Sequence, residues 1–242
     1  MRTRKKLAYV AASMKISLVY PVWKDESKVR PALIDINSFF SKFGVFVEVI
    51  LVFDPPYSVE IKKELDEIAV NKGHFSNLVL KPIWNKKTLY RGGSIARGLD
   101  TATNNLIAVA SIDLSTPLSE FFVLLQPLLE SQNSALVVVG KRALEGRKKH
   151  LQKPKRVLHK IIERMVAKEL QRSWPELGAS VPSTFAVNKL ASSALLEDLK
   201  NTKWFYLNGL LRSAHKNEIP VKNVEVLTMD QELSHFSIFR FV

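Results

Sequence analysis

Acidic side chains follow three of the apolar runs that read as buried strands, and these are the residues best suited to chemistry. Asp25, Asp54 and Asp113 each stand within three residues of the end of such a run. Because the carboxyl ends of parallel strands meet at one edge of a sheet, where α/β proteins bind ligands, the three carboxylates are expected at one site. Carboxylates in that position can hold a divalent cation or contact a nucleotide.

The elements that would position these acids alternate between short apolar runs and helix-period patterns. Branched and aromatic residues predict strands at 16–22, 46–53, 77–83, 106–112 and 135–139, and apolar spacing predicts helices at 29–43, 58–71, 90–103 and 117–132. Near-continuous apolar strands joined by crossover helices are typical of a parallel sheet covered on both faces. The sequence therefore predicts an α/β fold with a mostly parallel sheet and helices on both faces.

After residue 140 the alternation gives way to a basic stretch and a helical elaboration. Further along, the patterns predict a long helix at about 155–172, a short strand at 184–187, helices at 189–199 and 206–216, and a strand at 221–228. No internal repeat and no clear linker separates these elements from the first half. We therefore predict a single domain over 1–242.

The composition excludes several classes of protein. The chain has no cysteine, which removes disulfides, thiolate nucleophiles and zinc–thiolate sites. The five histidines are scattered without the spacing of metal ligands. No uncharged apolar run reaches about 18 residues, and no signal peptide follows the basic start, so a cytoplasmic protein without a membrane-spanning helix is expected.

Basic residues are concentrated in one segment. Thirty-six Lys and Arg against 23 Asp and Glu give a formal charge of +13, and most of the excess lies at 141–172. A helix there would carry Arg156, Lys160 and Arg164 beside a broad apolar face, which suits an anionic bilayer surface. The other interpretation is a helix packed on the sheet with a solvated basic rim. Nucleic acid is not favoured as a partner because no segment resembles an RNA- or DNA-binding module.

Several short motifs occur in an order known from one enzyme family. The sequence reads PVWKDE at 21–26, VFDPP at 52–56, GGSIAR at 92–97, SIDLSTP at 111–117 and GKR at 140–142. This series resembles the family 2 glycosyltransferases of the GT-A fold, particularly the polyprenyl-phosphate branch that includes dolichyl-phosphate mannose synthase-like proteins. The resemblance implies a Rossmann-like GT-A sheet with a nucleotide-sugar-binding half at 15–140 and an acceptor-side elaboration at 141–230.

The resemblance also implies an activity: inverting, metal-assisted transfer of a sugar from a UDP- or GDP-sugar to an acceptor, for which a polyprenyl phosphate is one candidate. Asp113 would hold Mg²⁺ or Mn²⁺ and the diphosphate, with Arg142 as a second catalytic residue. The implied nucleotide contacts are Pro21, Trp23, Asp25, Asp54 and Arg97, and the implied acceptor or anionic surface consists of Arg156, Lys160 and Arg164. A phosphate acceptor would need no general base because it is already an anion at neutral pH.

Acidic residues of the family pattern are replaced at three positions, which are Phe53, Ser111 and Gly209, and residues 180–185 offer no carboxylate where the family has an aspartate. The alternative function is therefore a catalytically inactive GT-A-like domain that binds a nucleotide, an anionic lipid or a partner protein. Two of the predicted site residues have structural alternatives as well. Asp113 suits a helix N-cap or a turn, and Trp23 suits core packing.

Overall fold

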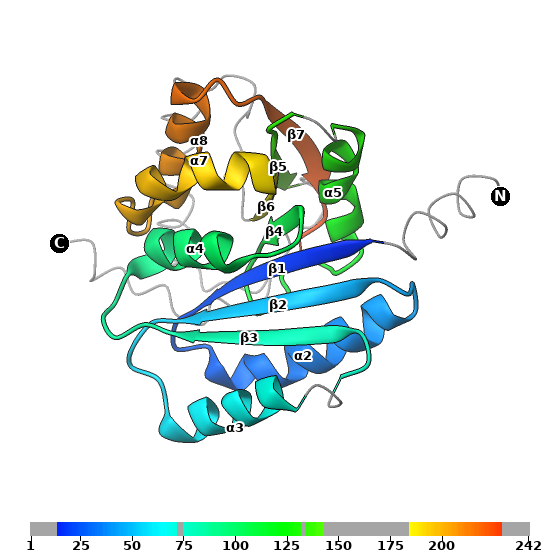
Figure 1. Cartoon of the computed structure of the whole chain (residues 1–242), viewed down its shortest axis with the longest axis vertical. Coiled ribbons are helices and arrows are strands. Elements are labelled where there is room, and N and C mark those ends of the chain that lie inside the picture. The colour runs from blue at the N-terminus through cyan, green and yellow to red at the C-terminus, as the bar shows by residue number, and fades with distance from the viewer. Residues whose placement is uncertain (1–13, 72–74, 132–133, 143–183, 229–242) are drawn as a thin grey trace, which may run out of the picture.

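The computed structural model describes residues 14–71, 75–131, 134–142 and 184–228, which form one seven-stranded sheet with flanking helices (Figure 1). The strands are β1 (Lys15–Val22), β2 (Phe46–Phe53), β3 (Leu78–Trp84), β4 (Leu106–Val109), β5 (Val137–Arg142), β6 (Thr184–Asn188) and β7 (Val221–Val226). The helices are α2 (Glu26–Ser41), α3 (Val59–Val70), α4 (Tyr90–Thr101), α5 (Glu120–Glu130), α7 (Lys189–Lys200) and α8 (Tyr206–Lys216).

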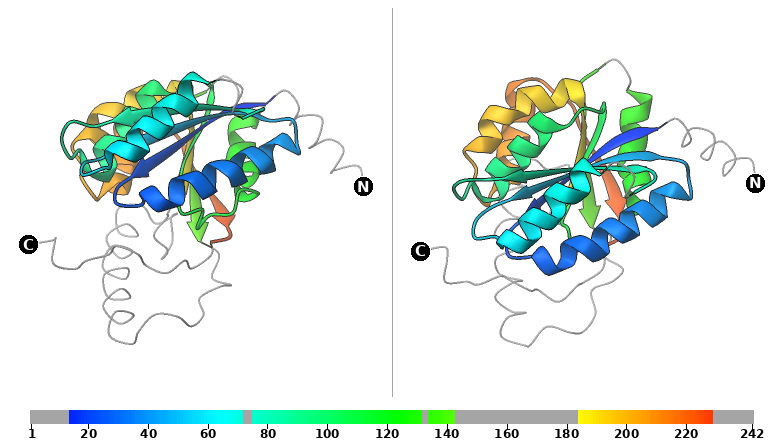
Figure 2. Two further views of the ribbon diagram at one scale, coloured as in Figure 1. Left: turned by 90° about the horizontal axis from the view of Figure 1, so that it is seen from below. Right: turned by 60° about the horizontal axis from the view of Figure 1, so that its bottom comes forward.

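The sheet is mixed but mostly parallel. Its strand order is β3-β2-β1-β4-β6-β5-β7, and of these strands β6 alone runs antiparallel to both of its neighbours. Helices α2, α3 and α5 pack on one face, and α4, α7 and α8 pack on the other (Figure 2). Strand β2 is buried along seven of its eight residues because its side chains enter both of these cores. The predicted α/β sheet with helices on both faces is confirmed.

Side-chain caps explain where two of the predicted helices begin. Ser58 accepts a hydrogen bond from the Ile61 N–H at 3.1 Å at the start of α3, and Asn188 accepts one from the Ala191 N–H at 3.0 Å at the start of α7. Such caps satisfy amide groups that a first helical turn leaves without partners. Asn188 also accepts a bond from the Leu136 N–H at 3.3 Å, so one side chain fixes both α7 and the approach to β5.

Four predicted boundaries are wrong by three residues. The helix predicted from residue 29 begins at Glu26, and the strand predicted to end at residue 139 continues to Arg142. The other two errors lie at turns. The strand predicted to reach residue 112 ends at Val109, because the chain turns with a bond from the Leu114 N–H to the Ser111 carbonyl at 3.2 Å and leaves the ladder. The helix predicted from residue 117 begins at Glu120. Both errors arise because apolar residues continue through a turn, and an apolar pattern alone does not locate a turn.

Some predictions concern parts of the chain that the structure does not describe. The basic helix at 155–172, with Arg156, Lys160 and Arg164, lies outside the described residues. The single-domain division also stays a prediction. Within the described ranges, none of the helices combines the length and the hydropathy needed to cross a bilayer.

A buried carboxylate joins three strands and the α4–β4 loop. Glu48 of β2 accepts hydrogen bonds from the Ser17 hydroxyl on β1 and the Lys81 ammonium on β3, both at 2.5 Å. Thr103 donates its N–H at 2.9 Å and its hydroxyl at 2.7 Å. Burial by itself would raise the pKa of Glu48, but the bonds from Lys81, Ser17 and Thr103 outweigh it and hold the pKa below its usual value. Glu48 is therefore ionised, with two bonds on each oxygen.

Because folding lowers the pKa of Glu48, the residue stabilises the protein above the ordinary value of 4.5 and loses this effect as the pH falls through the folded value. We expect Glu48→Ala to lower the free energy of unfolding at neutral pH by about 3 kcal/mol, because Lys81 loses its buried partner. The variant should also lose less stability than the wild type between about pH 7 and pH 3. Urea unfolding at both pH values measures the two effects.

The control for this experiment is Glu67→Gln on the exposed side of α3. It should change the free energy of unfolding by less than about 0.5 kcal/mol. Equal stability of the Glu48→Ala and Glu67→Gln variants would contradict the expectation.

Candidate functional site

The carboxyl ends of β1, β2 and β4 form one edge of the sheet, on the left in Figure 1. β1 lies between the other two strands and runs parallel to both. The pairing continues past the strands, since the Asp54 N–H bonds the Val22 carbonyl at 3.0 Å. The segments that carry Asp25, Asp54 and Asp113 therefore leave the sheet at the same edge, as the topology of a parallel sheet requires.

Asp54 is buried behind this edge, with 4% of its surface exposed. Its carboxylate accepts bonds from the Asn85 amide at 2.6 Å, the Ser94 hydroxyl at 3.1 Å and the Leu89 N–H at 3.1 Å. These partners come from the end of β3 and the start of α4, so Asp54 fixes the position of α4 against the sheet. Its predicted role as a nucleotide contact stays a prediction beside this structural one.

Arg97 belongs to the same network. It donates one hydrogen bond to the Asn85 side-chain oxygen and another to the Trp84 carbonyl at 3.4 Å. Asn85 is 1% exposed and thus links Arg97 to Asp54 inside the fold. The sequence alone does not single out Asn85, because an asparagine after a strand is common in turns.

Asp25 stands at the N-cap position of α2 but makes no side-chain cap bond. Its carboxylate pairs with Lys28 at 2.9 Å. The next residue, Glu26, accepts a bond from the Ser58 N–H at 2.9 Å and so holds the loop after β2 against the start of α2. Pro21 lies on β1, paired with β2. Both predicted nucleotide contacts are thus at the same edge, within one loop of each other.

Three aromatic rings from distant parts of the chain meet at this edge, and we call them the aromatic wall. Trp23 follows β1, Tyr90 begins α4, and Trp204 lies in the α7–α8 loop. Trp204 contacts Trp23 edge-on with ring centroids 5.6 Å apart and contacts Tyr90 at 6.0 Å. The ammonium groups of Lys24 and Lys203 lie 4.9 Å and 5.5 Å from the centres of the Trp23 and Tyr90 rings. The edge therefore combines aromatic surface with positive charge.

The backbone at the aromatic wall is strained. Lys24 and Tyr90 have φ values of 58°, and Lys203 has 43°. Non-glycine residues at positive φ are uncommon in proteins, and they cluster at functional sites because the surrounding structure must hold them. Three such residues around one aromatic cluster mark this edge as the candidate site.

Gly92 explains how α4 comes so close to the α7–α8 loop. Its N–H bonds the Lys203 carbonyl at 2.6 Å. A Cβ at this position would lie 2.3 Å from the Thr202 hydroxyl oxygen and 2.7 Å from the Leu199 carbonyl oxygen. The first glycine of the GGSIAR motif is therefore needed for close packing, and this packing brings Tyr90 to Trp204.

The two polar positions of the SIDLSTP motif have different partners. The Ser111 hydroxyl accepts a hydrogen bond from Nη2 of Arg91 at 3.1 Å, and the same guanidinium lies 5.2 Å from the centre of the Tyr206 ring. Asp113 accepts a bond from the Ser115 N–H at 3.0 Å and so closes a local turn. The turn alternative for Asp113 is thus present in the structure, while its second oxygen makes no bond to any described residue.

The remaining predicted site residues are not placed by the structure. Arg142 ends β5, but its side chain lies outside the described part of the chain, as do Arg156, Lys160 and Arg164. Arg91, Trp204 and Lys203 were missed by sequence reasoning. The run Lys203–Tyr206 was a usable signal, since three adjacent aromatic residues between two helical patterns are unusual for a solvated loop.

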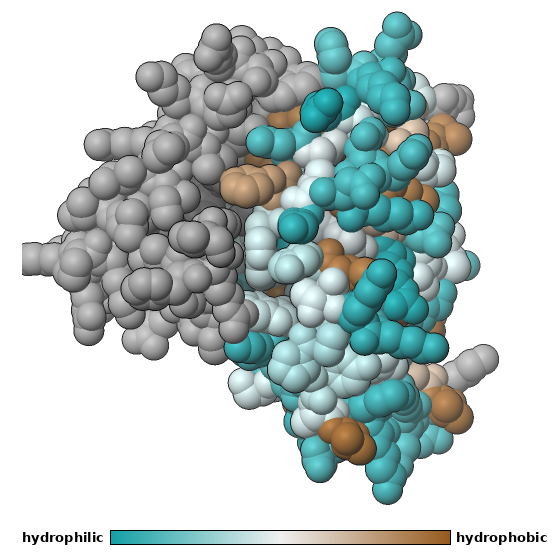
Figure 3. All heavy atoms as spheres, turned by 90° about the vertical axis from the view of Figure 1, so that its left-hand side faces the viewer, coloured by the Kyte–Doolittle hydropathy of each residue, from teal (hydrophilic) through white to brown (hydrophobic). Residues whose placement is uncertain are grey.

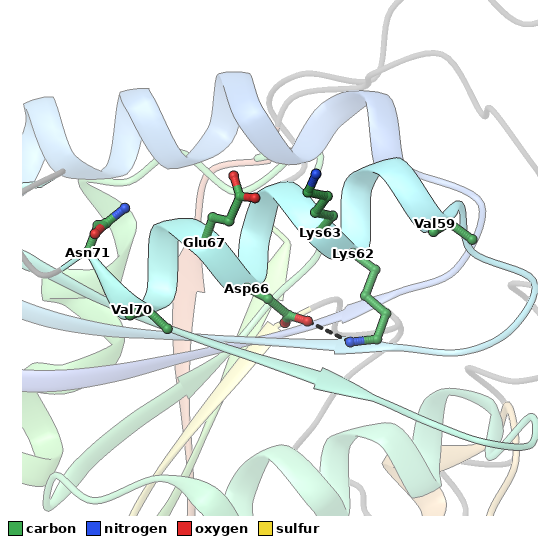
Figure 4. A pocket seen from close by; sticks show the side chains of 7 residues that line it. All are labelled: Val59, Lys62, Lys63, Asp66, Glu67, Val70 and Asn71. Atoms are coloured by element: carbon green, nitrogen blue, oxygen red, sulfur yellow. Dashed lines mark hydrogen bonds and ion pairs between the residues drawn. The ribbon is translucent and has the colours of Figure 1, made fainter.

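The face that carries the candidate site is polar for the most part. Seen from the carboxyl edge, the described surface is hydrophilic or intermediate in hydropathy, with hydrophobic residues in small separate groups (Figure 3). A shallow depression of about 550 Å³ lies elsewhere, along one side of α3 (Figure 4). Its lining residues repeat at helical spacing and are Val59, Lys62, Lys63, Asp66, Glu67, Val70 and Asn71. Because one helix supplies them all, this depression has no second wall and is not the candidate site.

Comparison with known proteins gives matches in structure but not in sequence. No family model and no curated protein matches the chain. A crystal structure of glucosyl-3-phosphoglycerate synthase from Mycobacterium tuberculosis matches with a TM-score of 0.58 and 17% identity, over 96% of this chain and 77% of that one. The same enzyme in complex with Mn²⁺, UDP-glucose and phosphoglyceric acid matches with a TM-score of 0.57 and 16% identity, over 95% and 77% of the two chains. Its complex with Mg²⁺ and UDP matches with 0.56 and 16%, over 95% and 76%.

These matches define the class of protein by its fold. The mostly parallel sheet with helices on both faces is the Rossmann-like GT-A fold of these solved structures. The predicted fold is therefore correct, including the elaboration of the sheet by elements that follow residue 140.

The described residues do not fit a divalent cation held at the two polar positions of the SIDLSTP motif. Asp113 is the one carboxylate there, and one of its oxygens is used by the Ser115 N–H. The Ser111 hydroxyl is bonded to a guanidinium, whose positive charge opposes a cation at the same place. No group of three His, Cys, Asp or Glu side chains suited to a metal occurs among the residues that the structure describes. The predicted Mg²⁺ or Mn²⁺ stays a prediction.

Gly209, which replaces an acid of the family pattern, gives a direct test of the packing behind the aromatic wall. The three atoms nearest to a Cβ on Gly209 would all belong to Thr202, with Cγ2 at 2.0 Å. We expect Gly209→Ala to lower the free energy of unfolding by about 1–3 kcal/mol, since the clash exceeds the gain in helix propensity. Adding Thr202→Ala should restore most of this loss, because the clashing methyl group is removed. Urea unfolding of the two single variants and the double variant measures the coupling, and strictly additive effects would contradict the packing.

Proposed function

We propose that this protein is a glycosyltransferase that takes a nucleoside-diphosphate sugar as its donor at the carboxyl edge of the sheet. The observation that carries the proposal is the meeting of the aromatic wall with Arg91, Lys24 and Lys203 at this edge. Aromatic faces suit a nucleobase, and guanidinium or ammonium groups suit a diphosphate. The fold supports the proposal, since neighbours of the same fold were crystallised with UDP and UDP-glucose.

In this proposal the predicted nucleotide residues have different roles. Trp23 of the aromatic wall contacts the base, as predicted, and Trp204 and Tyr90 join it. Pro21 and Asp25 lie in the adjacent segment and contact the nucleoside. Asp54 and Arg97 act through their hydrogen bonds, because they hold the start of α4 in place.

The proposed reaction is an inverting displacement at the anomeric carbon. Negative charge builds up on the departing diphosphate, and preorganised positive groups lower the barrier by stabilising it. Asp113 follows β4 and Arg142 ends β5, and we propose both as catalytic residues, as the family resemblance implies. A divalent cation belongs to the proposal only through the neighbours that contain Mn²⁺ or Mg²⁺.

For the acceptor we propose a molecule that carries a phosphate. An acceptor that attacks through an oxygen of its phosphate is already an anion and needs no general base, which agrees with the missing aspartate at 180–185. The solved neighbour is named a glucosyl-3-phosphoglycerate synthase and has been crystallised with phosphoglyceric acid, a small molecule that carries a phosphate. A polyprenyl phosphate at an anionic membrane surface remains the more specific proposal, and it depends on Arg156, Lys160 and Arg164.

A second candidate function is nucleotide binding without turnover. It is favoured by Ser111, whose hydroxyl is already bonded to Arg91, and by Asp113, whose carboxylate closes a turn. Such a protein would keep the aromatic wall and its affinity for a nucleotide but would not transfer the sugar. An assay that measures both nucleotide binding and sugar transfer separates the two functions.

The experiment is calorimetric titration of the full chain with UDP and GDP, followed by assay of nucleotide release from UDP- and GDP-sugars with phosphorylated acceptors. We expect one nucleotide to bind, and we expect Trp204→Ala to weaken it about tenfold or more because a stacking surface is lost. The control is Phe43→Ala, an aromatic residue that is 42% exposed after α2. It should leave the affinity unchanged.

The outcomes are separable. Turnover supports the transferase, and binding without turnover across the panel supports the second candidate. If neither UDP nor GDP binds to the protein, both functions are ruled out.

A further inference from the structure

Arg91 donates a hydrogen bond to Ser111, the position at which the family pattern that the sequence resembles has an acidic metal ligand. It is the second residue of α4 and is half-buried. Its Nη2 donates to the Ser111 hydroxyl at 3.1 Å, and its guanidinium carbon lies 5.2 Å from the centre of the Tyr206 ring. Three elements thus fix one cation: α4 carries it, the end of β4 accepts its hydrogen bond, and the start of α8 supplies a ring beneath it.

A neutral residue at position 111 is compatible with the Arg91 guanidinium beside it, whereas an acid or a bound cation at that position is not. An aspartate at 111 would pair with Arg91, and a divalent cation bound there would be repelled by it. Serine is a neutral acceptor that orients the guanidinium and leaves its charge uncompensated. Asp113 is two residues further on but bonds the Ser115 N–H within its own turn. Among the described contacts, Arg91 has no carboxylate partner.

A guanidinium with an uncompensated charge suits a diphosphate. Arginine has five N–H donors in a planar fork, of which Ser111 occupies one, so others can bond two phosphate oxygens side by side. Lys203 lies next to Trp204 in the sequence and over Tyr90, and it adds a second cation to the same edge. The aromatic wall is adjacent and would bind the base of the same ligand.

We propose that Arg91 binds the diphosphate of the donor nucleotide in place of a divalent cation, so that this chain binds nucleoside diphosphates without metal. The inference rests on the proposed function and specifies which group of the site neutralises the negative charge of the diphosphate. In the transfer step the acceptor oxygen forms a bond to the anomeric carbon while the bond from that carbon to the β-phosphate oxygen breaks. The electron pair leaves with the nucleoside diphosphate, and the Arg91 guanidinium stabilises the charge that appears there. A phosphate acceptor is already ionised, so no proton has to move.

The test is calorimetric titration of the full chain with UDP, GDP and the nucleosides uridine and guanosine, once with EDTA and once with Mn²⁺. We expect the better of the two nucleotides to bind with the same affinity, within about twofold, under both conditions. Arg91→Gln should weaken that nucleotide at least tenfold and leave its nucleoside within twofold, since only the diphosphate contact is lost. Arg91→Lys should fall in between, because it keeps the charge without the fork.

Two further variants sharpen the test. Arg30→Gln is the matched control, because this arginine lies on α2 and pairs with Glu64 of α3 at an exposed position. It should leave nucleotide affinity unchanged. Ser111→Asp places a carboxylate beside Arg91 and should weaken binding of the nucleotide at least tenfold in EDTA, because the new carboxylate pairs with the guanidinium.

Each contrary outcome has a distinct meaning. Binding that requires Mn²⁺, is lost in Asp113→Ala and persists in Arg91→Gln would overturn the inference and leave the proposed function standing. Equal loss of nucleotide and nucleoside in Arg91→Gln and Arg91→Lys would make Arg91 a structural residue and would also overturn the inference. Absence of nucleotide binding under both conditions would overturn the proposed function itself.

Discussion

The close contact between the start of α4 and the α7–α8 loop is the constraint on which the candidate site depends. The Gly92 N–H bonds the Lys203 carbonyl at 2.6 Å, and a side chain at Gly92 would collide with Thr202 and with backbone. This contact sets Tyr90 against Trp204, and Trp204 in turn against Trp23. Asp54 supports it from behind, because its bonds to the Leu89 N–H and to Ser94 fix α4 on the sheet. The aromatic wall therefore depends on the close approach of the α4 backbone to the α7–α8 loop, and not only on contacts between the rings.

At three positions where the family pattern that the sequence resembles has an acid, this chain has residues with defined tertiary contacts. Phe53 stacks on Trp84, with ring centroids 4.2 Å apart and planes 22° apart, and fills the space at the end of β2. Ser111 orients Arg91, and Gly209 leaves room for the Thr202 methyl group. Each replacement has a partner in the tertiary structure. Phe53, Ser111 and Gly209 are thus each accommodated by a neighbouring group in the fold.

The charges at the carboxyl edge are arranged differently from the charge of Glu48. Glu48 is a buried carboxylate whose two oxygens receive four hydrogen bonds, so its charge is fully matched inside the protein. At the candidate site Arg91 is oriented by a neutral hydroxyl and an aromatic ring, and Lys24 and Lys203 lie over rings. Among the described contacts, Glu48 is thus matched by hydrogen-bond donors, whereas Arg91, Lys24 and Lys203 have no carboxylate partner.

The sequence by itself determined the order of strands and helices, the face that each buries, and the edge to which Asp25, Asp54 and Asp113 are delivered. Those features follow from apolar periodicity and from the geometry of parallel strands, which are local or topological properties. Only the tertiary structure decided that β6 is inserted antiparallel between β4 and β5, that Asp54 is buried in a network with Asn85, and that Arg91 meets Ser111. Periodicity tells which side of an element is buried but not which distant segment covers it. Contacts between residues as far apart as Trp23 and Trp204 depend on how α4, α7 and α8 pack together.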